Sequence, residues 1–383
     1  MDTRDLVELL DKDTANCRKR EAVAFDRISE GTAGLVLFGA GGLGRKTLKG
    51  LRTAGMEPLA FSDSNKSLWG QSVDGVQILP PAEAVSRHGE SATFVITIWA
   101  EWAGRLEDQR HALQELGCRT VVPFTLLFWK FADLFLPHIQ VDLPSKVHEQ
   151  AEDVIRCGGL WADSASYAEY LAQVRWRLFS DFGCLAPPVK DMYFPPDVID
   201  SVRFDESSVF VDVGAYDGDT IAHFVERTHG RFRRVYAFEP DASNFVSMQH
   251  RLSRMSADTR SRIIARQQAV GDENCRLRFS EGGGTGSKVG AGESTVECVT
   301  LDSVIPETPS YMKFDIEGFE PEALAGACQI IARDRPGLAV CVYHLQDHLW
   351  KLPLLIHSLN PHYRFYLRPH GQVWETVCYA VAA

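Results

Sequence analysis

Short apolar runs alternate along this chain with segments whose apolar residues recur at helical spacing. The β-branched run Val209–Val213 predicts a strand that is buried on both faces. A glycine-containing loop, 214–218, follows, and Thr220 is expected to cap a helix whose inner face repeats at i, i+3 and i+4. A strand, a glycine turn and a helix N-terminus together form a nucleotide-binding unit.

The same order of elements occurs earlier in the chain. A strand over 34–39 runs into Gly-x-Gly-x-x-Gly, and a helix follows that we expect to end near Gly55. Asp63 closes the next predicted strand, where an acid can bind a ribose hydroxyl pair, and Arg45 and Lys46 suit a diphosphate. The candidate residues of this second nucleotide site are Gly39, Gly41, Gly42, Leu43, Gly44 and Asp63. The expected ligand is a nucleotide, a dinucleotide or a nucleotide-sugar; alternatively, the glycines serve only the turn and the helix packing.

These patterns predict an α/β protein with two Rossmann-like domains joined by a helical connector. The predicted parts are a helical segment at 1–32, a nucleotide-binding-type domain at 33–125, a connector at 126–206 and a second domain at 207–383. The connector is rich in aromatic residues, which we expect either to pack the two domains together or to offer a surface for homo-oligomer formation. Its segment 191–195 is a candidate lid over the second nucleotide-binding unit.

Composition and charge exclude several classes of function. The 383 residues carry a net charge of −11 without a Lys/Arg stripe, so nucleic acid is not an expected partner. The nine cysteines form no Cys-x-x-Cys pair, which predicts neither a zinc site nor a disulfide framework. No apolar run has the length of a membrane span, and the charged N-terminus lacks a signal core. We therefore expect a cytoplasmic protein with no membrane partner.

The glycine loop of the second domain contains three acids: Asp212, Asp217 and Asp219. A phosphate there would meet like charge, and one such pair at 4 Å costs roughly 4 kcal/mol at an effective dielectric of about 20. A neutral backbone hydrogen bond returns only about 1 kcal/mol. The loop therefore favours a cationic ligand without phosphate, and S-adenosylmethionine fits that description.

Further candidates for the cofactor site follow the next two strands. Glu239 lies at the end of a strand, twenty-one positions after Gly218, and matches a ribose-binding acid. A third strand through 263–272 is expected to border the adenine. The candidate cofactor-binding residues are Asp212, Gly214, Ala215, Tyr216, Asp217, Gly218, Asp219, Thr220, Glu239, Pro240, Ala269, Val270 and Asp315.

Three charged residues, Lys313, Asp315 and Glu317, alternate on one face of a later strand. Charges on a buried strand are costly unless they are paired or used, and ligands bind at strand tips in open α/β sheets. His344 is expected at the C-terminal end of the following strand. The candidate catalytic residues are therefore Asp315, Glu317 and His344, although an internal ion pair from Lys313 is an alternative for the acids.

Residues 207–381 resemble the FkbM-type family of S-adenosylmethionine-dependent methyltransferases. The resemblance is carried by VDVGAYDGDT at 211–220, FEP at 238–240, AVGD at 269–272, KFDIEGFE at 313–320 and ETVCY at 375–379. It implies a class I methyltransferase sheet of seven strands, the last antiparallel, and O-methylation of sugars or secondary metabolites. Residues 34–125 resemble, more loosely, the nucleotide-binding-type domain that precedes some sugar-modifying enzymes.

For such a reaction His344 is the candidate general base, since the ordinary pKa of histidine lies near neutrality. Asp315 is expected to orient that imidazole or to hold the methionine end of the donor. A purely structural role is the alternative for His344. No metal is expected; the alternative places Mg²⁺ on Asp315, Glu317, His344 and His348 to acidify a diol.

Two rival functions come from other classes. One is an oxidoreductase with NAD(P) on the first glycine loop, although no hydride-transfer residues stand out in that domain. The other is a nucleotide-sugar sensor with a non-catalytic methyltransferase-like domain, which the intact motifs speak against. The expected partner of the methyltransferase is a small-molecule or glycan acceptor.

Overall fold

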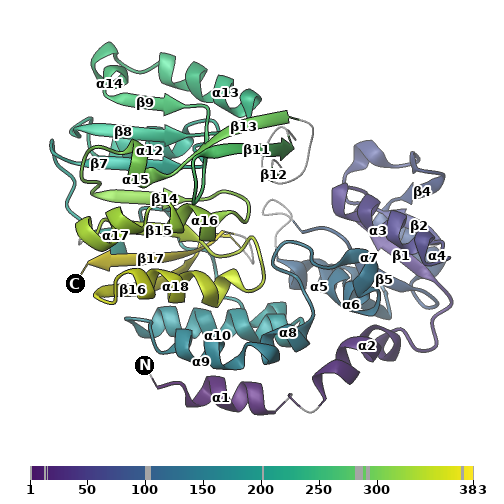
Figure 1. Ribbon diagram of the computed structural model, residues 1–383. Coiled ribbons are helices and arrows are strands. Elements are labelled where there is room, and N and C mark those ends of the chain that lie inside the picture. Colours follow the sequence, from purple (N-terminus) through teal and green to yellow (C-terminus); the bar gives the residue numbers. More distant parts are fainter. Residues whose placement is uncertain are drawn as a thin grey trace.

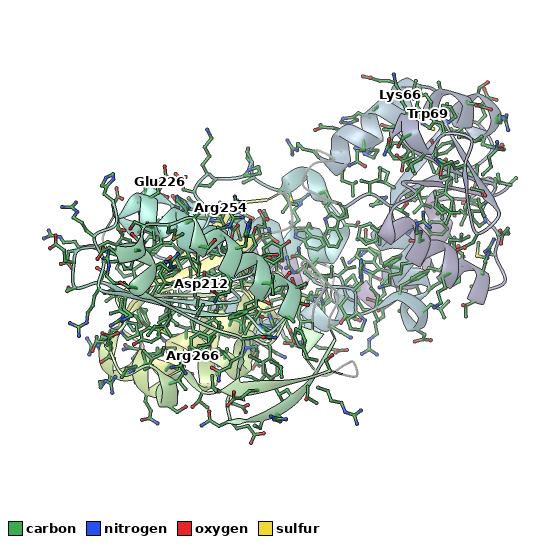
Figure 2. All side chains as sticks on the ribbon, turned by 90° about the horizontal axis from the view of Figure 1, so that it is seen from above. Lys66, Trp69, Asp212, Glu226, Arg254 and Arg266 are labelled. Carbon is green, nitrogen blue, oxygen red and sulfur yellow. The ribbon has the colours of Figure 1, made fainter. Side chains whose placement is uncertain are left out.

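The chain folds into two lobes, each built on its own sheet (Figure 1). The computed structural model describes residues 2–12, 14, 16–99, 105–200, 202–280, 288–289, 294–371 and 375–382. In Figure 2, Asp212 lies inside one lobe, whereas Lys66 and Trp69 lie in the other. The predicted α/β architecture with two Rossmann-like units is confirmed.

The N-terminal lobe contains a six-stranded sheet in the order β3-β4-β2-β1-β5-β6. Its strands pair in parallel, except that β3 and β4 form an antiparallel hairpin. The elements are β1 (Leu35–Phe38), α3 (Gly42–Thr53), β2 (Ala60–Ser62), η1 (Lys66–Leu68), β3 (Ser72–Val73), β4 (Val76–Leu79), α4 (Pro81–His88), β5 (Thr93–Ile96), α5 (Leu106–Glu115) and β6 (Thr120–Pro123). The strands β1 and β5 are buried throughout, as their apolar runs predict.

The C-terminal lobe contains a seven-stranded sheet in the order β16-β17-β15-β14-β7-β8-β9. Its strands are β7 (Val209–Val213), β8 (Arg234–Phe238), β9 (Ile263–Arg266), β14 (Tyr311–Phe314), β15 (Gly337–Cys341), β16 (Tyr363–Pro369) and β17 (Thr376–Ala382). Only β17 runs antiparallel to its neighbours among these strands. The expected sheet, with its last strand antiparallel, is therefore confirmed.

Helices cover both faces of this sheet (Figure 1). They are α12 (Asp219–Arg227), α13 (Ala242–Ser253), α14 (Ala257–Ser261), α15 (Leu301–Val304), α16 (Glu320–Ala325), α17 (Cys328–Asp334) and α18 (His348–Leu359). Asp241 caps α13, since its carboxylate accepts hydrogen bonds from the backbone of Ser243 and Asn244. The arrowheads of β7, β8 and β14 point toward the side on which the N-terminal lobe lies (Figure 1). The ligand-binding edge of the sheet therefore faces the other lobe.

A second, smaller sheet corrects one prediction. The expected single strand over 263–272 is two strands: β9 belongs to the main sheet, and β10 (Ala269–Val270) pairs with β13 (Ser294–Val299). The remaining strands of the small sheet are β11 (Cys275–Ser280) and β12 (Lys288–Val289). Polar residues interrupt the apolar run between β9 and β10, and Gln268 bonds to Glu297 of β13 at 2.9 Å. The chain leaves the main sheet at that point.

Helices between the lobes belong to both hydrophobic cores. They are α6 (Phe124–Lys130), α7 (Ala132–Phe135), α8 (Pro144–Glu149), α9 (Ala151–Gly158), α10 (Ser164–Phe179), η3 (Phe182–Cys184) and α11 (Pro196–Ile199). From α10, Tyr170 and Val174 pack into the C-terminal core, whereas Trp176 packs into the N-terminal core. The helical connector is confirmed. Many of its aromatic side chains are buried within the chain itself.

The first two helices are divided between the lobes in the same way. Leu6 and Leu10 of α1 (Arg4–Asp11) lie in the C-terminal core, whereas Phe25 of α2 (Cys17–Ile28) lies in the N-terminal core. Within the described part of the chain, no helix combines the length and the apolar character that a membrane crossing requires.

Candidate functional site

The glycine loop after β7 is shaped by contact with the strand beside it. Gly214 has a φ of +82°, and a Cβ there would lie 1.9 Å from the carbonyl oxygen of Asp315. Gly218, with a φ of +83°, is the N-cap of α12. The prediction that Thr220 caps this helix is wrong, because the helix already begins at Asp219 and Thr220 lies in its first turn. Both glycines are required by the backbone path rather than by composition alone.

Asp212 and Lys313 form a buried ion pair under the loop. Their side chains are 0% and 3% exposed, and Lys313 Nζ lies 3.1 Å from Asp212 Oδ1. Burial raises the pKa of Asp212 to about 6, although Lys313 acts in the opposite direction. Burial alone would lower the pKa of Lys313, but Asp212 and then Asp315 raise it above its ordinary value. Lys313 also donates a hydrogen bond to the carbonyl of Gly214, so the pair holds the loop in place.

A second acid of the loop is also compensated. Asp217 forms an ion pair with Arg251 of α13, whose Nε donates to the Asp217 carbonyl at 2.9 Å. Asp219 accepts a hydrogen bond from the backbone of Thr220 at 2.7 Å. The uncompensated negative charge expected from the sequence is therefore wrong for two of the three acids, because Lys313 pairs with Asp212 and Arg251 pairs with Asp217. The partner cations come from segments that motif spacing does not place beside the loop.

Glu239 lies at the C-terminal end of β8, as predicted, and is buried. Its Oε2 accepts a hydrogen bond from the backbone of Tyr216 at 2.8 Å, and its Oε1 accepts one from Asp241 at 2.9 Å. Burial raises the pKa of this carboxyl. Each carboxylate oxygen has a second lone pair, so the side chain that shapes the loop can still accept from a ribose hydroxyl. Pro240 directly follows it.

The candidates Ala269 and Val270 are buried in β10 of the small sheet. The next residue, Gly271, closely approaches the turn that follows β14: a Cβ on Gly271 would lie 3.0 Å from the ring of Phe319. Ala215 is buried beside the glycine loop, whereas Tyr216 is 39% exposed and has a φ of +47°. Ala215 and Tyr216 belong to the loop and hold it through their backbone N–H groups, which donate to the Phe238 carbonyl and to Glu239.

Asp315 and His344 lie beside each other at the ends of the neighbouring strands β14 and β15. His344 Nε2 is 3.3 Å from Asp315 Oδ1. The other oxygen, Asp315 Oδ2, accepts a hydrogen bond of 2.6 Å from the hydroxyl of Tyr193. The structure thus brings together two of the three predicted catalytic residues.

Glu320 is the residue of this cluster that the sequence reasoning did not single out. Its Oε1 lies 2.8 Å from His344 Nδ1 and accepts a backbone hydrogen bond from Ile316 at 2.8 Å. His348 Nδ1 is 3.3 Å from its Oε2. The cluster of Asp315, Glu320 and His344 holds the place that was predicted to include Glu317. Glu317 and Gly318 have φ values of +57° and +106°, so the chain turns sharply between Asp315 and Glu320.

The charges of this cluster reinforce one another. Burial opposes ionisation of all three groups. Even so, His344 and Lys313 hold the pKa of Asp315 well below its usual range, and His344 and His348 do the same for Glu320. In turn, Glu320 and Asp315 raise the pKa of His344 well above its ordinary value. In this arrangement the imidazole is held between two carboxylates.

The predicted lid, 191–195, is anchored to the sheet. The backbone N–H of Tyr193 donates to the hydroxyl of Tyr379 at 3.0 Å, and the hydroxyl of Tyr311 donates to the Tyr193 carbonyl. Phe194 is fully buried and packs against Phe210 and Tyr311. This segment therefore borders Asp315 as a fixed wall.

The glycines in the loop of the N-terminal lobe differ in how much space surrounds them. A Cβ on Gly39 would lie 2.3 Å from Ile98, and a Cβ on Gly44 would lie 2.0 Å from the Gly39 carbonyl. By contrast, Cβ atoms on Gly41 and Gly42 would meet nothing within 4 Å. Gly39 and Gly44 thus serve the turn and the packing, whereas the other two leave open space at the start of α3. Leu43 packs against the core of the lobe.

Asp63 follows β2 as predicted and braces this loop. Its Oδ2 accepts a hydrogen bond from the backbone of Ala40 at 2.8 Å, and its Oδ1 accepts one from Asn65 at 2.8 Å. The arrangement parallels that of Glu239 in the other lobe, where an acid after the second strand also binds the glycine loop.

Comparison with known proteins relates the C-terminal lobe to a methyltransferase family. Residues 212–373 match the family described as the methyltransferase FkbM domain. The crystal structure of methyltransferase FkbM from Methylobacillus flagellatus KT is similar over 98% of this chain and 97% of its own, with 24% identity and a TM-score of 0.78. That likeness shows the fold of both lobes. No curated protein matches the sequence.

Other solved structures are similar over about half of the chain. A putative rRNA-methylase from Clostridium thermocellum covers 48% of this chain and 90% of its own at 10% identity, with a TM-score of 0.33. Aeropyrum pernix fibrillarin, solved with natively bound S-adenosyl-L-methionine, covers 46% and 67% at 12% identity, with a TM-score of 0.30. Similarities of this size carry no argument about the present chain.

The sheet order and the glycine loop define a class I methyltransferase domain. More particularly, residues 212–373 match the model of the FkbM methyltransferase family, in agreement with the resemblance inferred from the motifs. The family supports S-adenosylmethionine-dependent methylation as the general activity of this enzyme.

Proposed function

We propose that the protein transfers the methyl group of S-adenosylmethionine to a hydroxyl group of a sugar, glycan or secondary metabolite. One observation carries this proposal. The glycine loop after β7, Glu239 after β8 and the pair Asp315–His344 all lie at the C-terminal ends of adjacent strands. A donor bound at the loop would therefore have proton-handling groups beside it.

The donor side fits the cofactor in shape and in hydrogen-bonding capacity. Gly214 and Gly218 let the backbone turn closely, and Glu239 retains lone pairs for ribose hydroxyls. Bound S-adenosylmethionine supplies an activated methyl group. The role of the chain is to hold the donor, to align the acceptor oxygen with it and to provide for the acceptor proton.

On the acceptor side, Asp315 and His344 are the proposed functional pair. His344 was predicted as the general base on the ordinary pKa of histidine, whereas Glu320 and Asp315 raise its pKa, so the ring must first release its own proton to act as a base. Its Nε2 faces Asp315 and its Nδ1 faces Glu320. An acceptor hydroxyl placed beside these two atoms, which lie 3.3 Å apart, would contact both groups. The acidic net charge supports a small-molecule or glycan acceptor rather than nucleic acid.

The test measures donor binding and turnover separately. Calorimetry should detect S-adenosylhomocysteine binding to the wild-type chain, and a methyl-labelled donor should label hydroxyl acceptors. His344→Ala should abolish labelling while donor binding is retained. His362→Ala, at an exposed histidine, is the matched control and should keep both. If the wild-type chain does not bind S-adenosylhomocysteine, the proposed donor site is refuted. If His344→Ala keeps full turnover, the proposed role of His344 is refuted.

A ligand in the N-terminal lobe is a second proposal, supported by the open space above Gly41 and Gly42. A nucleotide, dinucleotide or nucleotide-sugar phosphate would meet free backbone N–H groups at the start of α3. Calorimetry with NADH and with a uridine diphosphate sugar tests this. Gly41→Val should abolish any binding without unfolding the lobe, and binding unchanged by Gly41→Val would place the ligand elsewhere.

A cytoplasmic location is also proposed. All nine cysteines are free thiols in this structure, and six of them are buried. This usage is typical of a reducing compartment. Fractionation of the cells that make the protein tests the location directly.

A further inference from the structure

We infer that Asp315 and His344 bind a divalent transition-metal ion at the ends of β14 and β15, and that Glu320 holds the imidazole for it. The role of this ion rests on the proposed methyl transfer, whereas its binding does not. From the sequence no metal was expected, and the metal-dependent alternative used Glu317 as a ligand. Here Glu320 takes part instead, as the residue that orients His344.

One ligand atom each from Asp315, Glu320 and His344 lies within 4.8 Å of the others. His344 Nε2 and Asp315 Oδ1 are 3.3 Å apart. Two adjacent ligands of an octahedral ion with bonds of about 2.1 Å lie about 3 Å apart. The two atoms are therefore already spaced as adjacent ligands.

Three buried polar atoms around His344 make no hydrogen bond. They are His344 Nε2, His348 Nδ1 and Glu320 Oε2. His344 and His348 are each only 3% exposed, and Glu320 is 0% exposed. The 3.3 Å contact between His344 Nε2 and Asp315 thus has the distance of an ion pair without hydrogen-bond geometry. Buried polar atoms are normally satisfied, and a cation between Nε2 and the carboxylate supplies the missing partner.

Glu320 is a positioning residue, because it orients the His344 ring. It lies 2.8 Å from His344 Nδ1, and the backbone N–H of Ile316 holds the same carboxylate oxygen at 2.8 Å. When a metal ion displaces the second proton of the ring, a histidine whose Nδ1–H is held by a fixed carboxylate presents Nε2 to the ion. Metal-binding histidines are typically oriented by such a carboxylate.

The ligand set suggests the kind of ion and its role. One imidazole and one carboxylate leave several coordination positions for water and for acceptor oxygens. An acceptor hydroxyl on the ion would lose its proton to water more readily. Its oxygen then forms the new bond to the methyl carbon, the carbon–sulfur bond breaks, and the electron pair stays on sulfur in S-adenosylhomocysteine. On this assignment His344 acts on the proton through the ion.

The experiment uses Mn²⁺ as the probe and the full chain after treatment with EDTA. Electron paramagnetic resonance of free Mn²⁺ should show about one bound equivalent in the wild type. His344→Gln and Asp315→Asn should weaken binding at least about tenfold. His362→Gln is the matched control, because it makes the same substitution at an exposed histidine, and it should bind as the wild type does.

Two results would overturn the inference. One is a free Mn²⁺ signal that the wild-type protein leaves unchanged at millimolar concentration, which would mean that the imidazole is held by the two carboxylates alone. The other is equal Mn²⁺ affinity in the wild type and in His344→Gln. S-adenosylhomocysteine binding to His344→Gln, measured by calorimetry, verifies that the variant is folded. If the wild type itself does not bind S-adenosylhomocysteine, that result would count against the proposed methyl transfer, but not against the ion.

Discussion

The hydroxyl of Tyr193 donates a hydrogen bond of 2.6 Å to Asp315 Oδ2. Tyr193 belongs to the segment before the seven-stranded sheet, whereas Asp315 directly follows the central strand β14. The same tyrosine ring lies 5.1 Å from the ammonium group of Lys313. A residue outside the family motifs is thus built into the candidate site and fixes the direction of one of its carboxylates.

Tyr193→Phe removes this hydrogen bond while the ring is kept. A hydrogen bond to a charged group is worth about 1.5–3 kcal/mol, so we expect kcat to fall about 10- to 100-fold. Steady-state methyl transfer measures the effect. Tyr363→Phe is the control, because that hydroxyl bonds to the carbonyl of Pro336 and should affect stability only. A kcat for Tyr193→Phe equal to that of the wild type would show that the contact does not serve catalysis.

The Asp212–Lys313 pair should dominate the stability of the C-terminal lobe. Lys313→Met leaves a buried carboxylate without its cation, and we expect a loss of about 3–5 kcal/mol in the free energy of unfolding. Replacement of both, Asp212→Leu with Lys313→Met, removes both charges and should recover part of that loss. With Asp212→Leu alone as the third variant, urea denaturation completes a double-mutant cycle, and strictly additive effects would argue against the pair.

His370 should make the fold sensitive to acid. Its Nδ1 lies 2.8 Å from the Val189 carbonyl, and its Nε2 lies 2.7 Å from the Tyr379 hydroxyl. Nδ1 must therefore carry the hydrogen, and Nε2 accepts from Tyr379, which in turn accepts from the backbone of Tyr193. Burial lowers the pKa of His370, with Arg368 acting in the same direction and Asp197 and Asp191 against it.

The sign of the pH effect follows from that lowered pKa. The contribution of neutral His370 is present above the ordinary histidine pKa, and it is lost as the pH falls through the folded-state value. We expect stability to decline by up to about 1.4 kcal/mol per pH unit below pH 6.5 from this group. His370→Gln should flatten that part of the profile, whereas His362→Ala should not. Identical pH profiles for wild type and His370→Gln would exclude the effect.

The glycines of the two loops should differ in their tolerance of a side chain. Gly214→Ala places a Cβ 1.9 Å from a carbonyl oxygen at a positive φ, and we expect a loss of more than about 4 kcal/mol. Gly41→Ala meets nothing within 4 Å at a φ of −76°, so its effect should stay within about 0.5 kcal/mol. Thermal unfolding compares them, and similar losses in both variants would contradict the geometry.

Sequence reasoning reached the sheet and its motifs because these are local signals. The run Val209–Val213 and Glu239 could be placed by the order of strand, turn and acid alone. Lys313 and Arg251 were not assigned to the loop acids, because their contacts join residues 101 and 34 positions apart (313 minus 212, and 251 minus 217). Glu320 resembled an ordinary acid in the first turn of a helix, and only the turn at Glu317 and Gly318 brings it under His344.

The departure of β10 from the main sheet was equally hidden. The polar residues 266–268 interrupt the run from Ile263 to Val270 but do not show that its second part leaves the sheet, because that depends on pairing with β13, which follows later in the chain. Thr220 was assigned as a cap from residue preference, whereas the left-handed backbone of Gly218 starts the helix earlier. Local preference was overruled in both cases by contacts that form only in the folded chain.

Helix α10 inserts side chains into two separate hydrophobic interiors. A fragment that starts at residue 207 would therefore expose apolar surface normally covered by Tyr170 and Val174, and would be prone to aggregate. Any recombination that exchanges the C-terminal lobe for another would have to carry this helix along. The smallest unit that evolution or an engineer can transplant is accordingly larger than the stretch bearing the recognisable motifs.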